Sequence, residues 1–169
     1  ELQEKTRKEF VRHFILIACN TGLRVGEMRF MKWGNVTTNK EGRDYISVID
    51  VKISKTGERK GVIGRKGQYF NRLKKLSNFT TRNDLVFVDN RTGKQLAKTT
   101  LYRLWKQIMK GTGLDLFGSY TYYTLRHTYC TQRLLNGTDV FLLSKNMGTS
   151  VQHIENTYGH VKLWDKRHQ

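Results

Sequence analysis

The sequence predicts an α+β domain that is mainly α-helical, with helices around a small antiparallel sheet. Two observations carry this prediction. Apolar residues recur at helical spacing in several segments, and residues 45–53 alternate apolar and polar side chains with the period of a half-buried strand. The sequence has 169 residues, of which 37% are hydrophobic. This is the size and apolar content of one domain with one core.

The first half of the chain is predicted to contain two helices and a hairpin. A helix extends from the start to about Asn20, with Gly22 as its stop, and a short helix follows from Val25 to Met31. The alternating stretch then forms a strand, residues 55–58 turn the chain, and residues 59–63 return as a second strand. The resulting hairpin is rich in basic side chains.

The second half is predicted to be mostly helical. The elements expected in order are a helix at 65–76, a short strand at 85–88, and helices at 98–110, 124–136 and 139–147. Glycines end or separate the last three of these helices. Thr149 and Gln152 have capping-box spacing, so a final helix is expected to begin there and to carry Val151, Ile154 and Tyr158 on one face.

Charge points to a polyanionic partner. The chain has 31 Lys and Arg against 14 Asp and Glu, a net charge of +17, and such an excess favours nucleic acid through counterion release. A membrane surface is the competing partner, but no segment approaches the roughly 18 apolar residues of a spanning helix, and no signal-peptide pattern opens the chain. We therefore expect a cytoplasmic protein that binds no membrane.

Metal and cofactor sites are not predicted. The two cysteines, Cys19 and Cys130, lack CxxC spacing and are expected to be reduced, buried thiols. His153 and His160 lie seven residues apart, which fits neither a helical ligand pair nor a zinc finger.

Four segments carry residues suited to chemistry on a phosphate. In chain order they are Thr21-Gly22-Leu23-Arg24-Val25-Gly26-Glu27, Ser54-Lys55-Thr56-Gly57, Tyr123-Thr124-Leu125-Arg126-His127-Thr128, and Met147-Gly148-Thr149 followed by Tyr158. In this order, over residues 3–161, they resemble the catalytic domain of tyrosine recombinases of the phage-integrase type. The corresponding family boxes read T-G-x-R-x-x-E, a hairpin lysine, H-x-x-R-H-T, and L-G-H followed by the nucleophilic tyrosine.

The resemblance implies a site-specific DNA recombinase, or integrase, that cleaves and rejoins strands through a 3′-phosphotyrosyl intermediate without a metal. Arg24 and Arg126 would clamp the scissile phosphate, because a guanidinium donates paired hydrogen bonds to phosphate oxygens and keeps its charge. Tyr158 would attack the phosphorus, and Lys55 would protonate the departing 5′ oxygen. Glu27 would hold the neighbourhood of the first arginine.

Two positions depart from the family pattern. Tyr123 stands where the family usually has histidine, and a phenol is a poor proton acceptor at neutral pH; it either still serves as the acceptor or only donates a hydrogen bond to the phosphate. Thr149 replaces the usual His or Trp and either offers a hydroxyl to the site or caps the last helix. His127 follows the second arginine as in many relatives, in a supporting role or as a buried histidine bonded to backbone.

The resemblance also implies partners and a larger protein. It implies double-stranded DNA, a homotetramer that exchanges a carboxy-terminal segment beginning in residues 162–169, DNA-bending accessory proteins, and a place on the nucleoid of a bacterial cell. The amino-terminal core-binding domain of such recombinases is expected to be absent from residues 1–169. Two alternatives stay open: a non-catalytic DNA-binding module with a helix-turn-helix-like unit in residues 124–158, and a catalytically degenerate recombinase.

Overall fold

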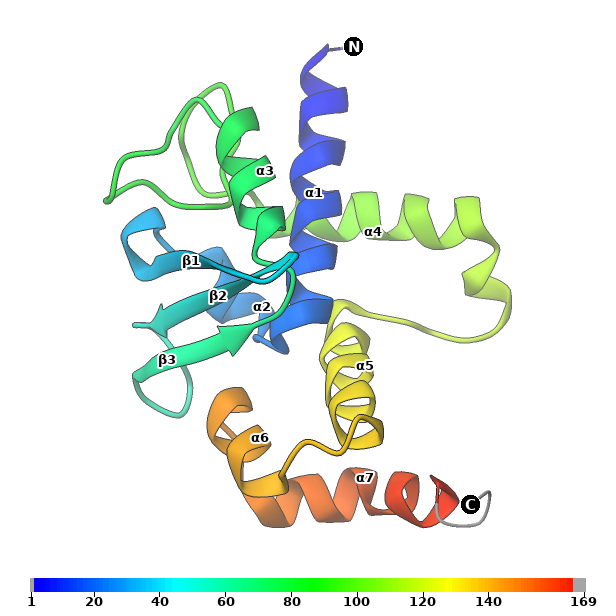
Figure 1. The fold of residues 1–169 in the computed structure, drawn as a ribbon. Helices are drawn as coiled ribbons and strands as arrows, with labels where there is room; N and C mark the ends of the chain where they lie inside the picture. Colours follow the sequence, from blue (N-terminus) through cyan, green and yellow to red (C-terminus); the bar gives the residue numbers. More distant parts are fainter. Residues whose placement is uncertain (1, 166–169) are drawn as a thin grey trace.

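The computed structural model describes residues 2–165, with side chains up to Gly159. Its elements are α1 (Leu2–Thr21), α2 (Val25–Arg29), η1 (Trp33–Asn35), β1 (Val36–Glu41), β2 (Asp44–Val51), β3 (Arg59–Gly64), α3 (Gln68–Leu76), α4 (Lys98–Thr112), η2 (Leu114–Leu116), α5 (Tyr122–Leu135), α6 (Val140–Met147) and α7 (Val151–Asp165). Seven α-helices thus surround one three-stranded antiparallel sheet in the described range (Figure 1). The predicted fold class is confirmed.

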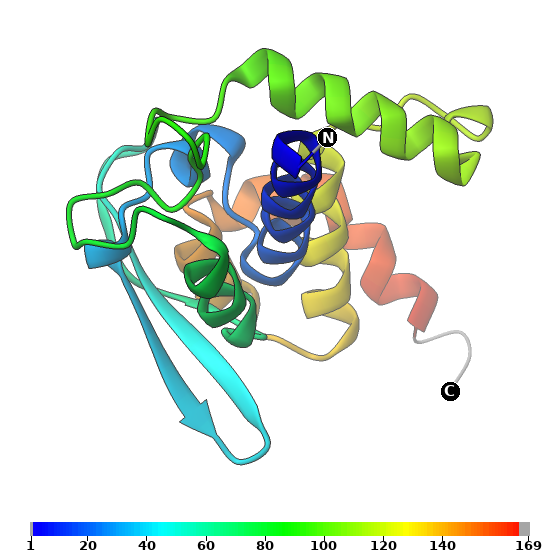
Figure 2. The same cartoon turned by 90° about the horizontal axis from the view of Figure 1, so that it is seen from above.

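Helix α1 is the centre of the domain, with the sheet and α3 on one side and α4 and α5 on the other (Figures 1 and 2). Phe10, Phe14 and Ile17 are each at most 1% exposed, because their spacing places them on one helical face. The helix ends as predicted at Gly22, whose φ of 66° lies in the left-handed region. A Cβ there would also overlap the ring of Tyr129, so this position requires glycine on two counts.

The sheet differs from the prediction in two respects: it contains an additional strand, β1, and β2 ends earlier than expected. Its order is β1-β2-β3, with Val36 opposite Ile49 and Ser47 opposite Gly64. Strand β1 was not predicted, because its side chains are mostly exposed and Val36 is its one apolar residue. Strand β2 ends at Val51, two residues earlier than expected.

The predicted strand at residues 85–88 is wrong. Leu85 and Val88 each form only an isolated bridge, to Lys32 and Gln95. Val86 and Phe87 between them are fully buried, so the apolar run reflects burial of an irregular segment in the core and not a ladder of strand pairs.

Several helix boundaries also shift. Helix α2 ends at Arg29 instead of Met31, and α3 begins at Gln68, three residues later than expected. Helix α4 continues through Gly111 to its last residue, Thr112, and the following Gly113, whose φ is 70°, caps it. A glycine is tolerated within an exposed helix, whereas a left-handed residue ends it.

The last three helices form a second, smaller cluster below the sheet (Figure 1). Both ends of helix α6 lie where they were predicted. The Asp139 side chain accepts a hydrogen bond from the amide of Leu142 at 2.9 Å, and Gly148 after the last turn has a φ of 65°. Ile154 and Tyr158 of α7 pack in this cluster at 1% and 6% exposure, as their spacing predicts. Residues 166–169, part of the segment expected to be exchanged between protomers, lie outside the described residues.

Candidate active site

Arg24 joins the start of α2 to the end of α6. Its backbone amide and its guanidinium Nη1 donate to the two carboxylate oxygens of Glu27 at 2.9 and 2.8 Å. Its Nη2 donates to the carbonyl oxygen of Gly148 at 2.8 Å. The side chain remains 25% exposed, so the first predicted arginine is fixed on one side and accessible on the other.

Arg126 lies beside the same two turns and is 4% exposed. Its guanidinium donates to the carbonyl oxygens of Gly22 at 2.6 Å and Met147 at 2.9 Å. Burial and the nearby positive charge of Arg24 lower the pKa of Arg126, while the Glu27 carboxylate opposes this change. Two cations held close together by backbone carbonyls form a region that an anion would stabilise.

Arg59 is a site residue that the sequence analysis missed. From the start of β3 its two terminal nitrogens donate to the two carboxylate oxygens of Glu27, each at 3.0 Å. Ser54 adds a hydrogen bond to Glu27 at 2.8 Å. The sequence showed only a basic hairpin, because the partner of Arg59 lies 32 residues earlier in the chain.

Glu27 is the common counter-charge of this cluster, because it pairs with both Arg24 and Arg59. Burial by itself would raise the pKa of the carboxyl, but the hydrogen bonds from Arg59, the Arg24 amide and Ser54 outweigh it and hold the pKa at about 2. Glu27 therefore links the helix that carries Arg24 to the hairpin that carries Lys55.

We expect Glu27 to make the fold sensitive to acid. Its pKa is about 2 in the folded protein against an ordinary value of 4.5, so its contribution is fully present above pH 4.5 and is lost as the pH falls through the folded value. The difference corresponds to about 3 kcal/mol of unfolding free energy. Urea denaturation followed by circular dichroism between pH 7 and pH 2 measures it.

Glu27→Gln is the matched control for this prediction. It should be about 3 to 5 kcal/mol less stable at neutral pH, because it leaves buried cations without a counter-charge. It should also lose that part of the acid dependence. Equal dependence on pH in the two proteins would show that Glu27 does not titrate as described.

Lys55 occupies the turn between β2 and β3, as predicted, and its side chain is exposed. The residues on either side are anchored to the arginine cluster, since Ser54 bonds Glu27 and Thr56 donates to the Gly148 carbonyl at 3.4 Å. The turn that carries the exposed Lys55 is therefore fixed to the arginine cluster through the two residues that flank it.

Tyr158 extends from α7 toward α5. Its hydroxyl oxygen lies 2.7 Å from Nδ1 of His127, and the two ring centroids are 5.5 Å apart. Burial, followed by the neighbouring Cys130 and Tyr123, raises the pKa of Tyr158, and Arg126 acts in the opposite direction. Cys130 is fully buried, as expected, whereas Cys19, which was also expected to be buried, is only partly buried. His127 thus contacts a hydroxyl and differs from the backbone-bonded alternative.

The two departures from the family pattern have different environments. Tyr123 lies in the first turn of α5, is 48% exposed, and packs edge-on against His127 with ring centroids 4.7 Å apart. Thr149 follows Gly148, and its amide donates to the Ser144 carbonyl at 3.0 Å. The capping role expected for Thr149 is wrong, because the Ser150 hydroxyl accepts the His153 amide at 3.1 Å and begins α7.

The four predicted boxes thus meet at one place, where α2, the β2–β3 turn, α5, α6 and α7 converge. The model of the Phage integrase family matches residues 1–163 of the sequence. This chain belongs to the phage integrase family.

Individual relatives agree with this membership. The chain is 25% identical over 170 residues to transposase A of transposon Tn554 from Staphylococcus aureus, covering 92% of this chain and 45% of the transposase. It is 34% identical over 78 residues to the tyrosine recombinase XerC of Chlamydia caviae, covering 46% of this chain and 24% of XerC. The matched region therefore spans 45% of the length of the transposase and 24% of the length of XerC.

The fold resembles that of a solved recombinase structure. The XerH site-specific recombinase, bound to a palindromic difH substrate in a post-cleavage complex, matches with a TM-score of 0.67 at 20% identity. The match covers 98% of this chain and 49% of XerH. This integrase-family chain thus has the fold of a recombinase region.

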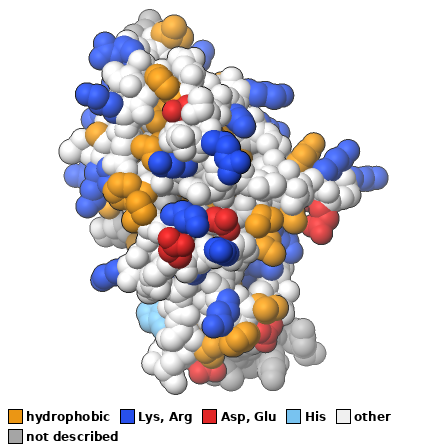
Figure 3. Space-filling view, turned by 90° about the vertical axis from the view of Figure 1, so that its left-hand side faces the viewer, with side chains coloured by type: hydrophobic (Ala, Val, Ile, Leu, Met, Phe, Trp, Pro, Cys, Tyr) orange, Lys and Arg blue, Asp and Glu red, His pale blue; other side chains and the backbone are white. Residues whose placement is uncertain are grey.

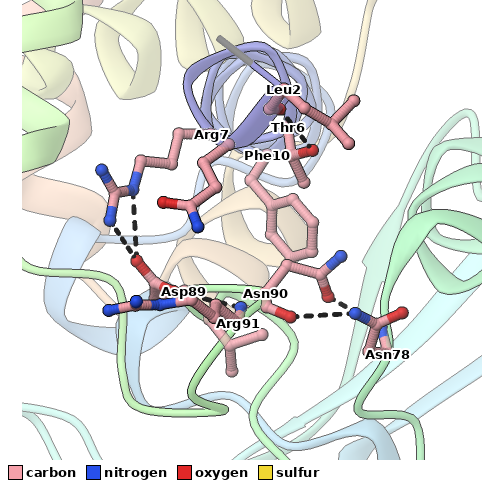
Figure 4. Close-up of a pocket in the computed structure, with 10 residues that line it drawn as sticks. Leu2, Thr6, Arg7, Phe10, Asn78, Asp89, Asn90 and Arg91 are labelled. Carbon is pink, nitrogen blue, oxygen red and sulfur yellow. Dashed lines mark hydrogen bonds and ion pairs between the residues drawn. The ribbon is translucent and has the colours of Figure 1, made fainter.

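One cavity of this integrase-family chain lies apart from the arginine cluster. A cavity of about 210 Å³ lies between α1 and the loop at residues 89–91, as Figure 4 shows. It shares no lining residue with the arginine cluster, and its Arg7 is paired with Asp89 at 2.6 Å. Within residues 2–165 no group of three or more His, Cys, Asp or Glu is placed to hold a metal. No helix of the described chain is both long and apolar enough to span a membrane.

Proposed function

We propose that this chain is the catalytic domain of a site-specific recombinase that cleaves DNA through a covalent bond to Tyr158 and rejoins the strands. The observation that carries this proposal is the convergence of Arg24, Arg126 and Tyr158 from three separate segments. The two arginines are fixed by the carbonyls of the Gly22 and Met147–Gly148 turns. The Tyr158 hydroxyl contacts the residue directly after Arg126.

Each group then has one task. Arg24 and Arg126 neutralise the charge that develops on the phosphate oxygens, and preorganised donors of this kind each contribute on the order of a hundredfold or more in rate. The Tyr158 oxygen bonds to phosphorus while the bond to the 5′ oxygen breaks, and Lys55 donates a proton to that leaving oxygen. The phosphotyrosyl ester conserves the energy of the phosphodiester, so a 5′ hydroxyl reverses the step without ATP.

We propose double-stranded DNA as the partner, with a homotetramer assembled on it. The net charge of +17 supports a polyanionic partner. Figure 3 shows Lys and Arg side chains spread over the face on the sheet side, with acidic side chains confined to a few places. The fold is also similar to that of the Tn1549 transposon integrase, which was solved in complex with circular intermediate DNA.

The test is covalent capture of DNA. The full-length protein is incubated with a pool of nicked suicide duplexes of randomised sequence, in which the cleaved short strand diffuses away, and adducts are isolated on a denaturing gel. We expect an adduct that forms equally in EDTA, because side chains are assigned every step, and DNA binding that weakens steeply with salt. DNA binding without any adduct would indicate a non-catalytic module or a degenerate recombinase, and loss of the adduct in EDTA would overturn the assignment to side chains alone.

A further inference from the structure

We propose that His127 is the proton acceptor for Tyr158 in this chain. This inference rests on the proposed function and assigns to His127 the task for which Tyr123, at the family's usual histidine position, is chemically unsuited. The carrying observation is the 2.7 Å contact between Nδ1 of His127 and the Tyr158 hydroxyl oxygen. That distance is within the reach required of a general base.

The contact is built by the packing of α5 against α7. Tyr158 and His127 are 31 residues apart in sequence, and both helices contribute to the small cluster that buries Tyr158 to 6% exposure. His127 directly follows Arg126, so the proton acceptor and the phosphate clamp are adjacent on one helix. A base in this position acts on the nucleophile while the neighbouring arginine holds its target.

The surroundings of His127 disfavour the protonated form of its imidazole. Among the side chains that the structure describes, the charged or titratable groups near it are Arg126 and Tyr123 of α5 and His153 and Tyr158 of α7. Burial, followed by the charges of Arg126 and His153, lowers the pKa of His127. In the neutral tautomer with its proton on Nε2, the Nδ1 atom accepts a hydrogen bond from the Tyr158 hydroxyl, and the proposal assigns this tautomer to the reacting state.

Tyr123 has a different relation to the nucleophile. It is 48% exposed, and its ring contacts the edge of His127. A phenol offers a hydroxyl hydrogen, so Tyr123 serves as a donor to the phosphate and as a support for the imidazole, and His127 serves as the acceptor. The roles that one histidine performs in the usual family pattern are thus divided here between two adjacent turns of α5.

The proposed step balances in atoms and charge. The proton of the Tyr158 hydroxyl passes to Nδ1 of His127, the oxygen of Tyr158 bonds to phosphorus, and the bond from phosphorus to the 5′ oxygen breaks. Lys55 supplies the proton for that 5′ oxygen. In religation the incoming 5′ hydroxyl returns a proton to Lys55, and His127 returns its proton to Tyr158.

The experiment measures the rate of adduct formation by rapid quench between pH 5 and pH 9, with a duplex isolated by covalent capture. His127→Asn places an amide near Nδ1 that forms a hydrogen bond and takes no proton. We expect it to slow cleavage by about 10² to 10⁴-fold near neutral pH and to remove the fall in rate on the acid side of the wild-type profile. A duplex with sulfur at the 5′ bridging position should not restore the rate, because it replaces only the proton that Lys55 supplies.

Tyr123→Phe is the comparison variant. It should be about ten- to a hundredfold slower, as expected for one lost hydrogen bond in the transition state, and should keep the acid-side fall of the wild type. In His127→Ala, which leaves space for a small base, added imidazole should restore a rate that follows the fraction of neutral imidazole. Restoration of the rate by imidazole would also show that the site of His127→Ala is folded.

The outcomes separate this inference from the proposed function. A His127→Asn rate within a few fold of wild type with an unchanged pH profile would overturn the inference. So would loss of the acid-side fall in Tyr123→Phe, which would make Tyr123 the acceptor, or a lack of response of His127→Ala to imidazole. Absence of an adduct in the wild-type protein would overturn the proposed function itself, and the role of His127 with it.

Discussion

Replacing Tyr158 by phenylalanine is expected to abolish the covalent adduct while DNA affinity stays within about a few fold of wild type. The substitution removes the only atom proposed to bond phosphorus and changes no charge, so the arginine clamp and the salt-dependent attraction to DNA persist. The lost hydrogen bond to His127 is worth about 0.5 to 1.5 kcal/mol of stability, and the ring still fills the cluster around Cys130. The fold should therefore survive the change.

The measurement is adduct formation on the suicide duplex beside an equilibrium binding titration. Tyr129→Phe is the matched control, since Tyr129 lies in the same cluster and its hydroxyl accepts a hydrogen bond from Asn146 at 2.9 Å. It removes the same atom type from an equally buried ring and should leave the adduct intact. An adduct that persists in Tyr158→Phe would show that another residue is the nucleophile.

Lys55→Ala is expected to slow cleavage by about 10² to 10⁴-fold, the usual contribution of a general acid. A duplex with sulfur at the 5′ bridging position should restore the rate, because a thiolate leaves without a proton. Lys55 is exposed and the turn around it is anchored by Ser54 and Thr56, so the fold of the hairpin should not change.

Single-turnover cleavage of the oxygen and sulfur duplexes measures this effect. Lys60→Ala is the matched control, because it removes an equal charge from an exposed position of the same hairpin. It should weaken DNA binding as Lys55→Ala does and show no preference for sulfur. If the sulfur duplex does not restore the rate of Lys55→Ala, Lys55 binds or positions DNA and another group supplies the proton.

The sequence by itself determined the elements whose signals are local. Asp139 and Gly148 predicted both ends of α6, because a side-chain cap and a left-handed glycine act within a few residues of the chain. The apolar spacing of α1 and of Ile154 and Tyr158 likewise predicted the buried faces. The residues of the four boxes were found the same way, since each lies in a short segment with a family pattern.

Elements without a local signal were decided by the tertiary structure. Strand β1 exists because its backbone pairs with β2, and its exposed polar side chains carry no trace of that pairing. The apolar run of residues 85–88 indicates burial alone, and the surrounding core, not periodicity, determines that it forms isolated bridges. Ser150 caps α7 instead of Thr149, whose amide still closes the turn at the end of α6.

The pairings within the site were decided by packing alone. Arg59 reaches Glu27 because the β2–β3 hairpin lies against the start of α2, and His127 reaches Tyr158 because α7 crosses α5. Periodicity and capping describe the backbone over a few residues, whereas these contacts join positions about 30 residues apart. The sequence therefore predicted which side chains are suited to a phosphate, and the fold decided which of them meet, including the histidine that contacts the nucleophile.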